Sequence, residues 1–433
     1  MMLYVKLFLI SILGLSILSV SILRQNPVMA QSYVQTIKHR NLVIDLGNEV
    51  KTNAQLTYPA IGKGPFPGVL LIHGSGALNM NGTLVGYVHK VAAQPYKSLW
   101  QIAQYLSERG FAVLRYDKRG VGENHLDTNV WGNATGNDAI HDAEKALNVL
   151  VQQPEVDPKR ISIIGHSEGT LYAPRIAIDN STKVKNIILM GTVAQNFGDI
   201  VFYQYVNLLL RYAAQVLDKN HTGSISIQQI SKDPFRYSAL LTNLLPSSIL
   251  LTFSRTHDTK VISNALVNEF GNNAIQVSHV SIDKQLKPLL IKKYENLTAS
   301  NPSKCNNVLG CPIWMRSMLR LIPTLSIIGN VSKSTGILLL NGENDSQTPV
   351  QQAFLLQQRL TEVKHPDHTL ITYPNLGHGF SPSSQWSSTF GPVPPYVLAD
   401  IYAWLEAHSG LSHSYIATPT STLGANTNSS SKK

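Results

Sequence analysis

Short runs of apolar residues recur along this chain, and segments with a helical pattern of apolar positions separate them. Such runs are typical of strands that are buried on both faces of a parallel sheet. Strands that alternate with helices at this spacing predict a doubly wound α/β fold. We expect a mostly parallel eight-stranded sheet, which opens with an antiparallel pair, with strands at 41–46, 54–58, 68–73, 111–116, 161–164, 185–190, 336–341 and 368–373. Helices that flank the sheet are expected at 96–109, 137–152, 170–178, 351–362 and 397–408.

The alternation of strands and helices stops in the middle of the chain. Apolar helical patterns fill this stretch, at 202–217, 237–253, 264–272 and 282–294. We therefore interpret 195–335 as a mostly helical cap, inserted before the seventh strand, that divides the core into 31–194 and 336–409. From 410 to 433 the chain is rich in Ser, Thr and Asn with few apolar residues, which predicts a disordered polar tail.

Residues 1–30 predict a targeting segment. Lys6 is the only charge before the apolar run 7–23, and Val28-Met29-Ala30 offers a small-residue cleavage site. The run is longer than the usual core of a signal peptide and just shorter than a full membrane span. A cleaved signal peptide is the favoured interpretation, and an uncleaved N-terminal anchor is the alternative. Both place the body of the protein outside the cytoplasm, secreted or held at the surface.

Composition and charge change this picture little. The chain has 433 residues, of which 43% are hydrophobic, enough for a full core with an insertion. Its formal net charge is +10, but no basic run or basic helix concentrates that charge, so no nucleic-acid partner is expected. Cys305 and Cys311 are close in the sequence and could close a small disulfide loop in an exported protein, or could remain two thiols.

The candidate chemistry begins at Gly165-His166-Ser167-Glu168-Gly169, between the strand at 161–164 and the helix at 170–178. Strand, glycine-flanked turn and helix are the context in which G-x-S-x-G forms a nucleophile elbow. The helix start places backbone N–H groups and positive partial charge beside the serine oxygen, where negative charge develops during acyl transfer. The bare pattern is weak, so a base and an acid are needed further along the chain.

A serine hydroxyl is a poor nucleophile unless an adjacent base, oriented by a third group, activates it. In a sheet of this kind the order Ser, Asp, His is expected. Asp345 follows the strand at 336–341 and His378 follows the strand at 368–373, so both leave the carboxyl edge of the sheet. We predict that His378 is the base for Ser167 and that Asp345 orients it.

Other residues compete for these roles. Glu343 lies in the same loop as Asp345, but the spacing from Gly342 and the following Thr-Pro favour Asp345. His365 and His368 lie before or at the start of the last strand and are predicted to be surface residues.

The oxyanion hole needs two backbone donors. The N–H of Glu168, directly after the nucleophile, is expected to be one of them. The other is expected from the loop after the third strand, with Ser75 favoured and Gly76 as the alternative. His73 and His166 flank the site and are interpreted as packing residues, not as proton carriers.

Five motifs together carry a resemblance: His73-Gly74-Ser75-Gly76, Arg115-Tyr116-Asp117-Lys118-Arg119-Gly120-Val121-Gly122, Gly165-His166-Ser167-Glu168-Gly169, Gly342-x-x-Asp345-x-x-Thr348-Pro349 and Gly377-His378-Gly379. They resemble those of the α/β-hydrolase superfamily, and within it the esterases and serine peptidase-like hydrolases of the dienelactone hydrolase and prolyl oligopeptidase types. The resemblance covers roughly 40–194 and 336–409. It implies hydrolysis of an ester, amide or peptide bond through an acyl-enzyme, with no cofactor.

One loop departs from the family pattern. Relatives with Asp-Lys-Arg-Gly-x-Gly commonly continue into a serine, where this chain has Glu123-Asn124. Asp117 and Arg119 of this loop are interpreted as a structural turn pair that supports the site. A contact of these two residues with substrate is the alternative.

A second motif lies in the cap, where Asp218, Asn220 and Thr222 have the spacing of the first calcium ligands of an EF-hand loop. Glycine follows at the sixth position, but the twelfth is Gln229 instead of the bidentate Glu, and the sequence indicates no paired second loop. Calcium binding here is a weak alternative to a plain helix–turn–helix.

These observations predict a serine hydrolase that cleaves small or medium carboxylic esters, with specificity set by the cap. The nearest alternative is an aminopeptidase, which would need an acidic group in the cap to hold the substrate amine; Glu269 and Asp283 are among the few there. A non-catalytic binding protein on the same fold is the third. The expected partner is a small-molecule ester or a short peptide, and membrane contact is expected only through the N-terminal segment.

Overall fold

A computed structural model describes residues 36–85, 96–231, 244–245, 249, 256, 258–270, 279–299 and 312–411. The predicted targeting segment, the two cysteines, most of the predicted helix at 237–253 and all but the start of the predicted tail lie outside these ranges. Within the described ranges, no helix is long and apolar enough to cross a membrane.

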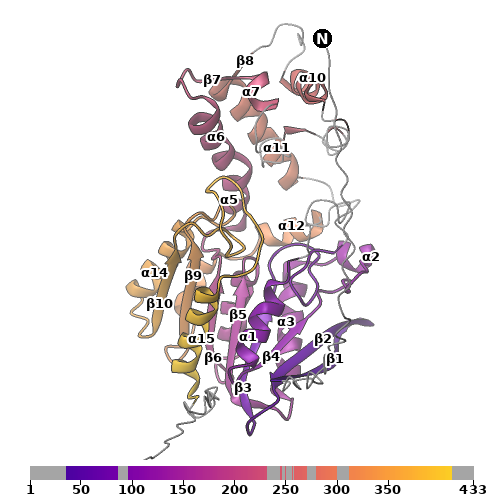
Figure 1. Cartoon of the computed structure of the whole chain (residues 1–433), viewed down its shortest axis with the longest axis vertical. Coiled ribbons are helices and arrows are strands. Elements are labelled where there is room, and N and C mark those ends of the chain that lie inside the picture. The colour runs from indigo at the N-terminus through magenta and orange to yellow at the C-terminus, as the bar shows by residue number, and fades with distance from the viewer. Residues whose placement is uncertain are drawn as a thin grey trace, which may run out of the picture. The chain divides into compact units, whose positions relative to one another are not determined.

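An eight-stranded sheet forms the core of the described chain (Figure 1). Its strand order is β1-β2-β4-β3-β5-β6-β9-β10. The β1–β2 and β2–β4 pairs are antiparallel, and every other neighbouring pair is parallel. The predicted fold class is thereby confirmed. The strands are β1 Ile37–Gly47, β2 Val50–Pro59, β3 Phe66–Ile72, β4 Ala112–Tyr116, β5 Val156–His166, β6 Val184–Met190, β9 Gly336–Gly342 and β10 His368–Tyr373.

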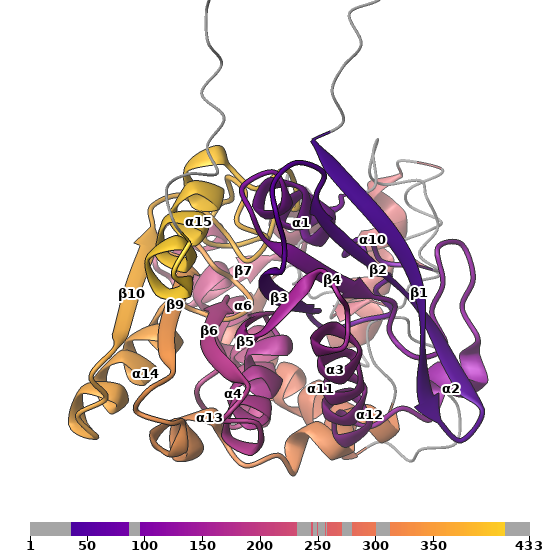
Figure 2. The ribbon, with the colours of Figure 1, turned by 90° about the horizontal axis from the view of Figure 1, so that it is seen from below.

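Helices cover both faces of this sheet, because β3, β5, β6 and β9 present apolar side chains on both sides. Helices α3, α4 and α14 pack on one face and helices α1 and α15 on the other, so each face has its own apolar core (Figure 2). The helices are α1 Ser98–Ser107, α2 Thr128–Gly132, α3 Gly136–Val151, α4 Gly169–Asp179, α14 Gln351–Glu362 and α15 Pro395–Ser409.

Between β6 and β9 the chain leaves the sheet and forms mostly helices with an apolar core of their own. The first helical stretch contains two π-helical segments, and two short strands pair antiparallel. The elements are α5 Phe197–Phe202, η1 Tyr203–Asn207, α6 Leu208–Tyr212, η2 Ala213–Leu217, β7 Ser224–Ser226, α7 Ile227–Ser231, α10 Thr259–Phe270, β8 His279–Ser281, η3 Ile282–Leu286, α11 Lys287–Ala299, α12 Pro312–Leu319, α13 Thr324–Ile327 and η4 Ile328–Asn330.

This inserted segment is bonded to the core near the carboxyl ends of the strands. Gln204 Nε2 of η1 donates to the carbonyl oxygen of Gln347 at 2.9 Å, in the loop that follows β9. The hydroxyl of Ser317 in α12 accepts from the N–H of Gly136, the first residue of α3, at 2.7 Å. The segment therefore borders the edge of the sheet at which α/β folds carry their sites.

Candidate active site

Ser167 lies at a sharp turn between β5 and α4. Its φ angle is +53°, in the left-handed region that residues with side chains rarely adopt. A Cβ atom on Gly165 would lie 2.3 Å from the carbonyl oxygen of Gly169, and one on Gly169 would lie 2.7 Å from the carbonyl oxygen of Ile72. Both glycines are thus required by close backbone contacts. The turn has the strained geometry of a nucleophile elbow.

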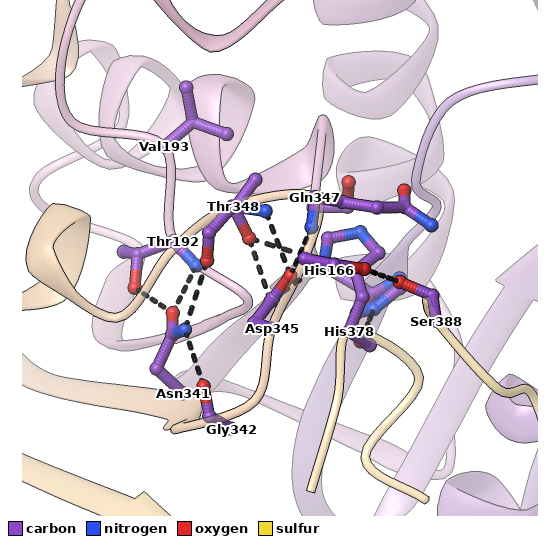
Figure 3. A network of polar contacts seen from close by, with 12 residues as sticks. His166, Thr192, Val193, Asn341, Gly342, Asp345, Gln347, Thr348, His378 and Ser388 are labelled. Atoms are coloured by element: carbon purple, nitrogen blue, oxygen red, sulfur yellow. Dashed lines mark hydrogen bonds and ion pairs between the residues drawn. The ribbon is translucent and has the colours of Figure 1, made fainter. Parts of the chain in front are cut away.

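Asp345 and His378 form a buried pair in the loops that follow β9 and β10 (Figure 3). The distance from His378 Nδ1 to Asp345 Oδ2 is 2.8 Å. Because an ionised carboxylate can only accept, Nδ1 carries the hydrogen and Nε2 is free to act as a base. The competing carboxylate, Glu343, is exposed and accepts from the hydroxyl of Thr372 at 2.9 Å.

Further hydrogen bonds fix the carboxylate of Asp345. Its Oδ1 accepts from the N–H groups of Gln347 and Thr348, both at 2.8 Å, and its Oδ2 accepts from the hydroxyl of Thr348 at 2.9 Å. Asn341 then joins this loop to the end of β6. Its Oδ1 accepts from the N–H of Thr192 at 2.8 Å and its Nδ2 donates to the carbonyl of Thr348 at 3.1 Å (Figure 3). Asn341 and Thr192 were not predicted, although an Asn that ends an apolar strand is a usable signal.

The end of β6 contacts both the serine turn and the histidine. The N–H of Ser167 donates to the carbonyl of Met190 at 2.8 Å. A Cβ atom on the next residue, Gly191, would lie 3.2 Å from His378 Cε1. Within the described part of the chain, Ser167 Oγ has no hydrogen-bond partner, and catalytic hydrogen bonds are often long until substrate binds. Ser167, Asp345 and His378 therefore lie at one edge of the sheet.

Backbone N–H groups from two loops lie beside the serine. A Cβ atom on Gly74 would lie 3.1 Å from Ser167 Cβ, so the loop after β3 is packed against the turn. Among the described residues, the N–H groups of Glu168, Ser75 and Gly76 donate to no protein acceptor. All three of the predicted oxyanion donors are thus available, and the choice between Ser75 and Gly76 stays open.

His73 and His166 are held as neutral imidazoles. Burial, reinforced by the nearby Lys118 cation, lowers the pKa of His73 to about 3. Burial, reinforced by His378, lowers the pKa of His166 to about 4. Nε2 of His73 donates to the carbonyl of Tyr116, and Nε2 of His166 donates to the carbonyl of His378 at 3.0 Å. Their contacts are those of packing residues, and His166 also anchors the backbone of His378.

Asp117 and Arg119 do not form the pair that was predicted. Arg119 makes two hydrogen bonds to Asp142 of α3, from Nε at 2.8 Å and from Nη2 at 2.6 Å. Asp117 instead accepts from the N–H of Met80 at 2.6 Å, and burial raises its pKa. Both residues brace loops around the site, but each binds a partner distant in sequence.

The prediction that His365 is a surface residue was wrong. Its side chain is 3% exposed, and Nε2 donates to the carbonyl of Ser332 at 3.2 Å. His368 is half-buried, and its Nδ1 donates to the carbonyl of His365 at 2.8 Å. Neither histidine contacts Ser167.

The EF-hand-like loop is closed by its own hydrogen bonds. Asp218 Oδ1 accepts from the N–H of Thr222 at 2.9 Å, and Oδ2 accepts from the N–H of Gly223 at 2.7 Å. Gln229 at the twelfth position accepts from the N–H of Ser226 at 2.7 Å. Among the described residues no group of three or more His, Cys, Asp or Glu side chains could hold a metal ion. Calcium binding by Asp218, Asn220 and Thr222 stays a prediction.

The loop has a partner that the sequence did not indicate. Strand β7, which contains the eighth loop residue Ile225, pairs antiparallel with β8 through Val280. Both side chains are fully buried in the apolar core of the inserted segment. The loop therefore holds two helical stretches of this segment together.

Two family models match parts of the chain. The model of serine aminopeptidase, S33, matches residues 89–245, and the model of the prolyl oligopeptidase family matches residues 310–412. The first range contains Ser167, and the second contains Asp345 and His378. Both matches thus fall on the segments that carry the candidate site.

Relatives match over part of their own length. The chain is 31% identical to esterase EstD of Thermotoga maritima over 147 residues, which are 34% of this chain and 32% of EstD. It is 26% identical to the putative hydrolase YtaP of Bacillus subtilis over 188 residues, 40% of this chain and 61% of YtaP. The chain thus spans about a third of one relative and three fifths of the other. Among solved structures it is similar to the acylaminoacyl peptidase of Pyrococcus horikoshii, with a TM-score of 0.48 and 12% identity over 87% of this chain and 42% of that one.

Proposed function

Because the chain belongs to the α/β-hydrolase superfamily, we propose that it is a serine hydrolase that cleaves carboxylic esters through an acyl-enzyme. The observation that carries this proposal is the buried 2.8 Å hydrogen bond from His378 Nδ1 to Asp345. It leaves His378 Nε2 as a base at the edge of the sheet where the strained Ser167 turn lies.

In the first half of the reaction, His378 Nε2 takes the hydroxyl proton as Ser167 Oγ attacks the ester carbonyl carbon. The carbonyl oxygen becomes an oxyanion and accepts hydrogen bonds from the N–H of Glu168 and from that of Ser75 or Gly76. The imidazolium then gives its proton to the departing alkoxide. The alcohol leaves, and the acyl group stays on the serine.

In the second half, a water molecule takes the place of the alcohol. His378 removes a proton from this water while the water oxygen attacks the acyl carbon. The intermediate collapses, the proton passes to Ser167 Oγ, and the carboxylic acid leaves. Asp345 keeps Nδ1 of the histidine protonated and stabilises the imidazolium in both halves.

An aminopeptidase is the second candidate, because both matching family models describe peptidase families. Such an enzyme holds the substrate ammonium with an acidic group, and one of the two acids named for the cap is already paired with a lysine. Glu269 lies 2.6 Å from the Lys293 ammonium.

Paired substrates separate the two candidates. We expect the protein to hydrolyse p-nitrophenyl esters of short and medium acyl chains, and to hydrolyse aminoacyl p-nitroanilides far more slowly. Ser167→Ala is expected to abolish both activities, by a factor of at least about 10⁴ in kcat. Faster turnover of the aminoacyl anilides would favour the aminopeptidase, and activity that survives Ser167→Ala would contradict the proposed nucleophile.

A further inference from the structure

A buried cation lies directly behind the loop that supplies the oxyanion donors. Lys118, in the turn after β4, has a side chain that is 11% exposed. Its Nζ donates to the carbonyl oxygen of Gly74 at 2.6 Å. The same Nζ lies 3.4 Å from Oε1 of Glu168. One ammonium group thus contacts both segments that carry the proposed oxyanion donors.

The carboxylate that holds this ammonium belongs to Glu168, the residue after the nucleophile. The Glu168 side chain is 1% exposed, and its Oε1 also accepts from the hydroxyl of Tyr172 at 2.6 Å. Tyr172 lies one turn further along α4, so the carboxylate is fixed from within its own helix. Glu168 therefore serves two purposes, because its N–H is an oxyanion donor while its side chain anchors Lys118.

Two further polar groups of this cluster are buried. Glu168 Oε2 and the indole N–H of Trp131 are buried without a partner among the described residues, and both residues line one small cavity of about 30 Å³. The cavity is wide enough for a water molecule that could bond these two groups. Lys118 Nζ also lies 5.6 Å from the Trp131 ring centre. Burying the Lys118 charge is costly unless it is paired and hydrogen-bonded, and the Glu168 carboxylate and the Gly74 carbonyl supply these contacts.

We propose that Lys118 is a positioning residue of the oxyanion hole, which holds the Gly74–Ser75 peptide in place and polarises its N–H. The carbonyl of Gly74 and the N–H of Ser75 belong to one planar peptide unit and point in opposite directions. A charge-assisted hydrogen bond to the carbonyl therefore strengthens the N–H as a donor. The inference rests on the proposed function, and it selects Ser75 over Gly76 as the second donor.

The test uses the full chain and a pair of substitutions. Lys118→Met alone leaves the buried Glu168 carboxylate without its cation, which can unfold the protein. The double variant Lys118→Met, Glu168→Gln removes both charges and keeps the N–H of residue 168, so it leaves no unpaired buried charge. Lys183→Met is the matched control, because Lys183 bonds Asn148 on the surface at 3.2 Å.

The readouts are kcat and KM for p-nitrophenyl butyrate, and the affinity of a trifluoromethyl ketone that forms an oxyanion on Ser167. Loss of one oxyanion donor lowers kcat by about 10²–10³-fold. Loss of Lys118, which only positions and polarises such a donor, should therefore lower kcat by about 10- to 100-fold. We expect this loss in kcat with little change in KM, and an equal loss of ketone affinity.

Unchanged kcat and ketone affinity in a folded double variant would overturn the role of Lys118 while leaving the proposed function intact. A change confined to KM would overturn it as well, because it would indicate a role in substrate binding. If wild-type turnover does not depend on Ser167, the proposed function fails, and the inference fails with it.

Discussion

Replacing Asp345 by Asn exchanges one oxygen for an NH2 group, and the structure dictates which way the amide must face. Asp345 Oδ1 accepts from two backbone N–H groups, those of Gln347 and Thr348, both at 2.8 Å. Only the amide oxygen can take that place in Asp345→Asn. The amide nitrogen must then face His378 Nδ1, where it can only donate. His378 is forced into the tautomer with its hydrogen on Nε2, which cannot accept the Ser167 proton.

This change of tautomer determines how far kcat falls. An equivalent substitution in an established Ser-His-Asp triad costs about 10⁴-fold in kcat with the geometry intact, which corresponds to about 5 kcal/mol of activation free energy. The cost to folding is smaller, because the two backbone hydrogen bonds to Oδ1 persist. Rearrangement of the Thr348 hydroxyl, which now donates to Oδ2 at 2.9 Å, adds about 1 kcal/mol.

The assay compares kcat for p-nitrophenyl butyrate with the free energy of unfolding in urea, for the wild type, Asp345→Asn and the control Glu343→Gln. Glu343 lies in the same loop, is exposed and contacts Thr372 instead of His378, so its variant should be as active as the wild type. If Asp345→Asn keeps more than about a tenth of the wild-type kcat, or if Glu343→Gln loses as much activity, Asp345 does not orient the base.

Two further predictions concern stability. Gly165→Ala would place a methyl group 2.3 Å from the backbone oxygen of Gly169, so it should lower the free energy of unfolding by about 3 kcal/mol in a urea titration. Gly122→Ala is the control, because its Cβ would lie 3.9 Å from its nearest neighbour. Equal losses of stability in the two variants would contradict the close contact at Gly165. The pKa of His73, lowered by burial to about 3, means that the unfolded chain binds a proton below about pH 6.5 while the folded chain does not. The contribution of His73 to the free energy of unfolding is therefore complete above pH 6.5 and falls by about 1.4 kcal/mol per pH unit on acidification. His73→Gln should remove this part of the pH dependence of stability. An unchanged pH dependence in the variant would contradict the burial of a neutral His73.

The three residues of the candidate triad could be predicted because their signals are local. Gly165 and Gly169 flank Ser167 in a pattern that is weak by itself, but the apolar strand and the helix that adjoin it are the context of a nucleophile elbow. Asp345 and His378 each follow an apolar strand directly, and parallel strands bring their carboxyl ends to one edge. Local pattern and sheet topology together were enough to place these three residues near one another.

The groups that support these residues could not be predicted, because they act across long separations. Lys118 reaches Gly74 across 44 positions, and Asn341 reaches Thr192 across 149. The residues next to Lys118 in the sequence do not indicate which carbonyl oxygen its ammonium group binds. The predicted partner of Arg119, Asp117, was wrong for the same reason, because the observed partner Asp142 lies on the next long helix.

The burial of His365 and several short helices and strands were also not predicted from the sequence. His365 was expected at the surface because it precedes a strand, yet it packs beneath the turn at Ser332. Helices α2 and α12 were not predicted, because they have only five and eight residues and give a weak periodic signal. The pairing of β7 with β8 was also missed, since three-residue strands carry almost no alternation.

The central claim is that Ser167 is the nucleophile of an acyl-enzyme, and covalent trapping tests it most directly. A fluorophosphonate ester is added to the wild-type protein and to Ser167→Ala, and the digested peptides are analysed by mass spectrometry. We expect one phosphonate adduct, on the peptide that contains Ser167 in the wild type, and no adduct on the variant. An adduct on another residue, or ester hydrolysis by a wild-type protein that takes up no label, would contradict it.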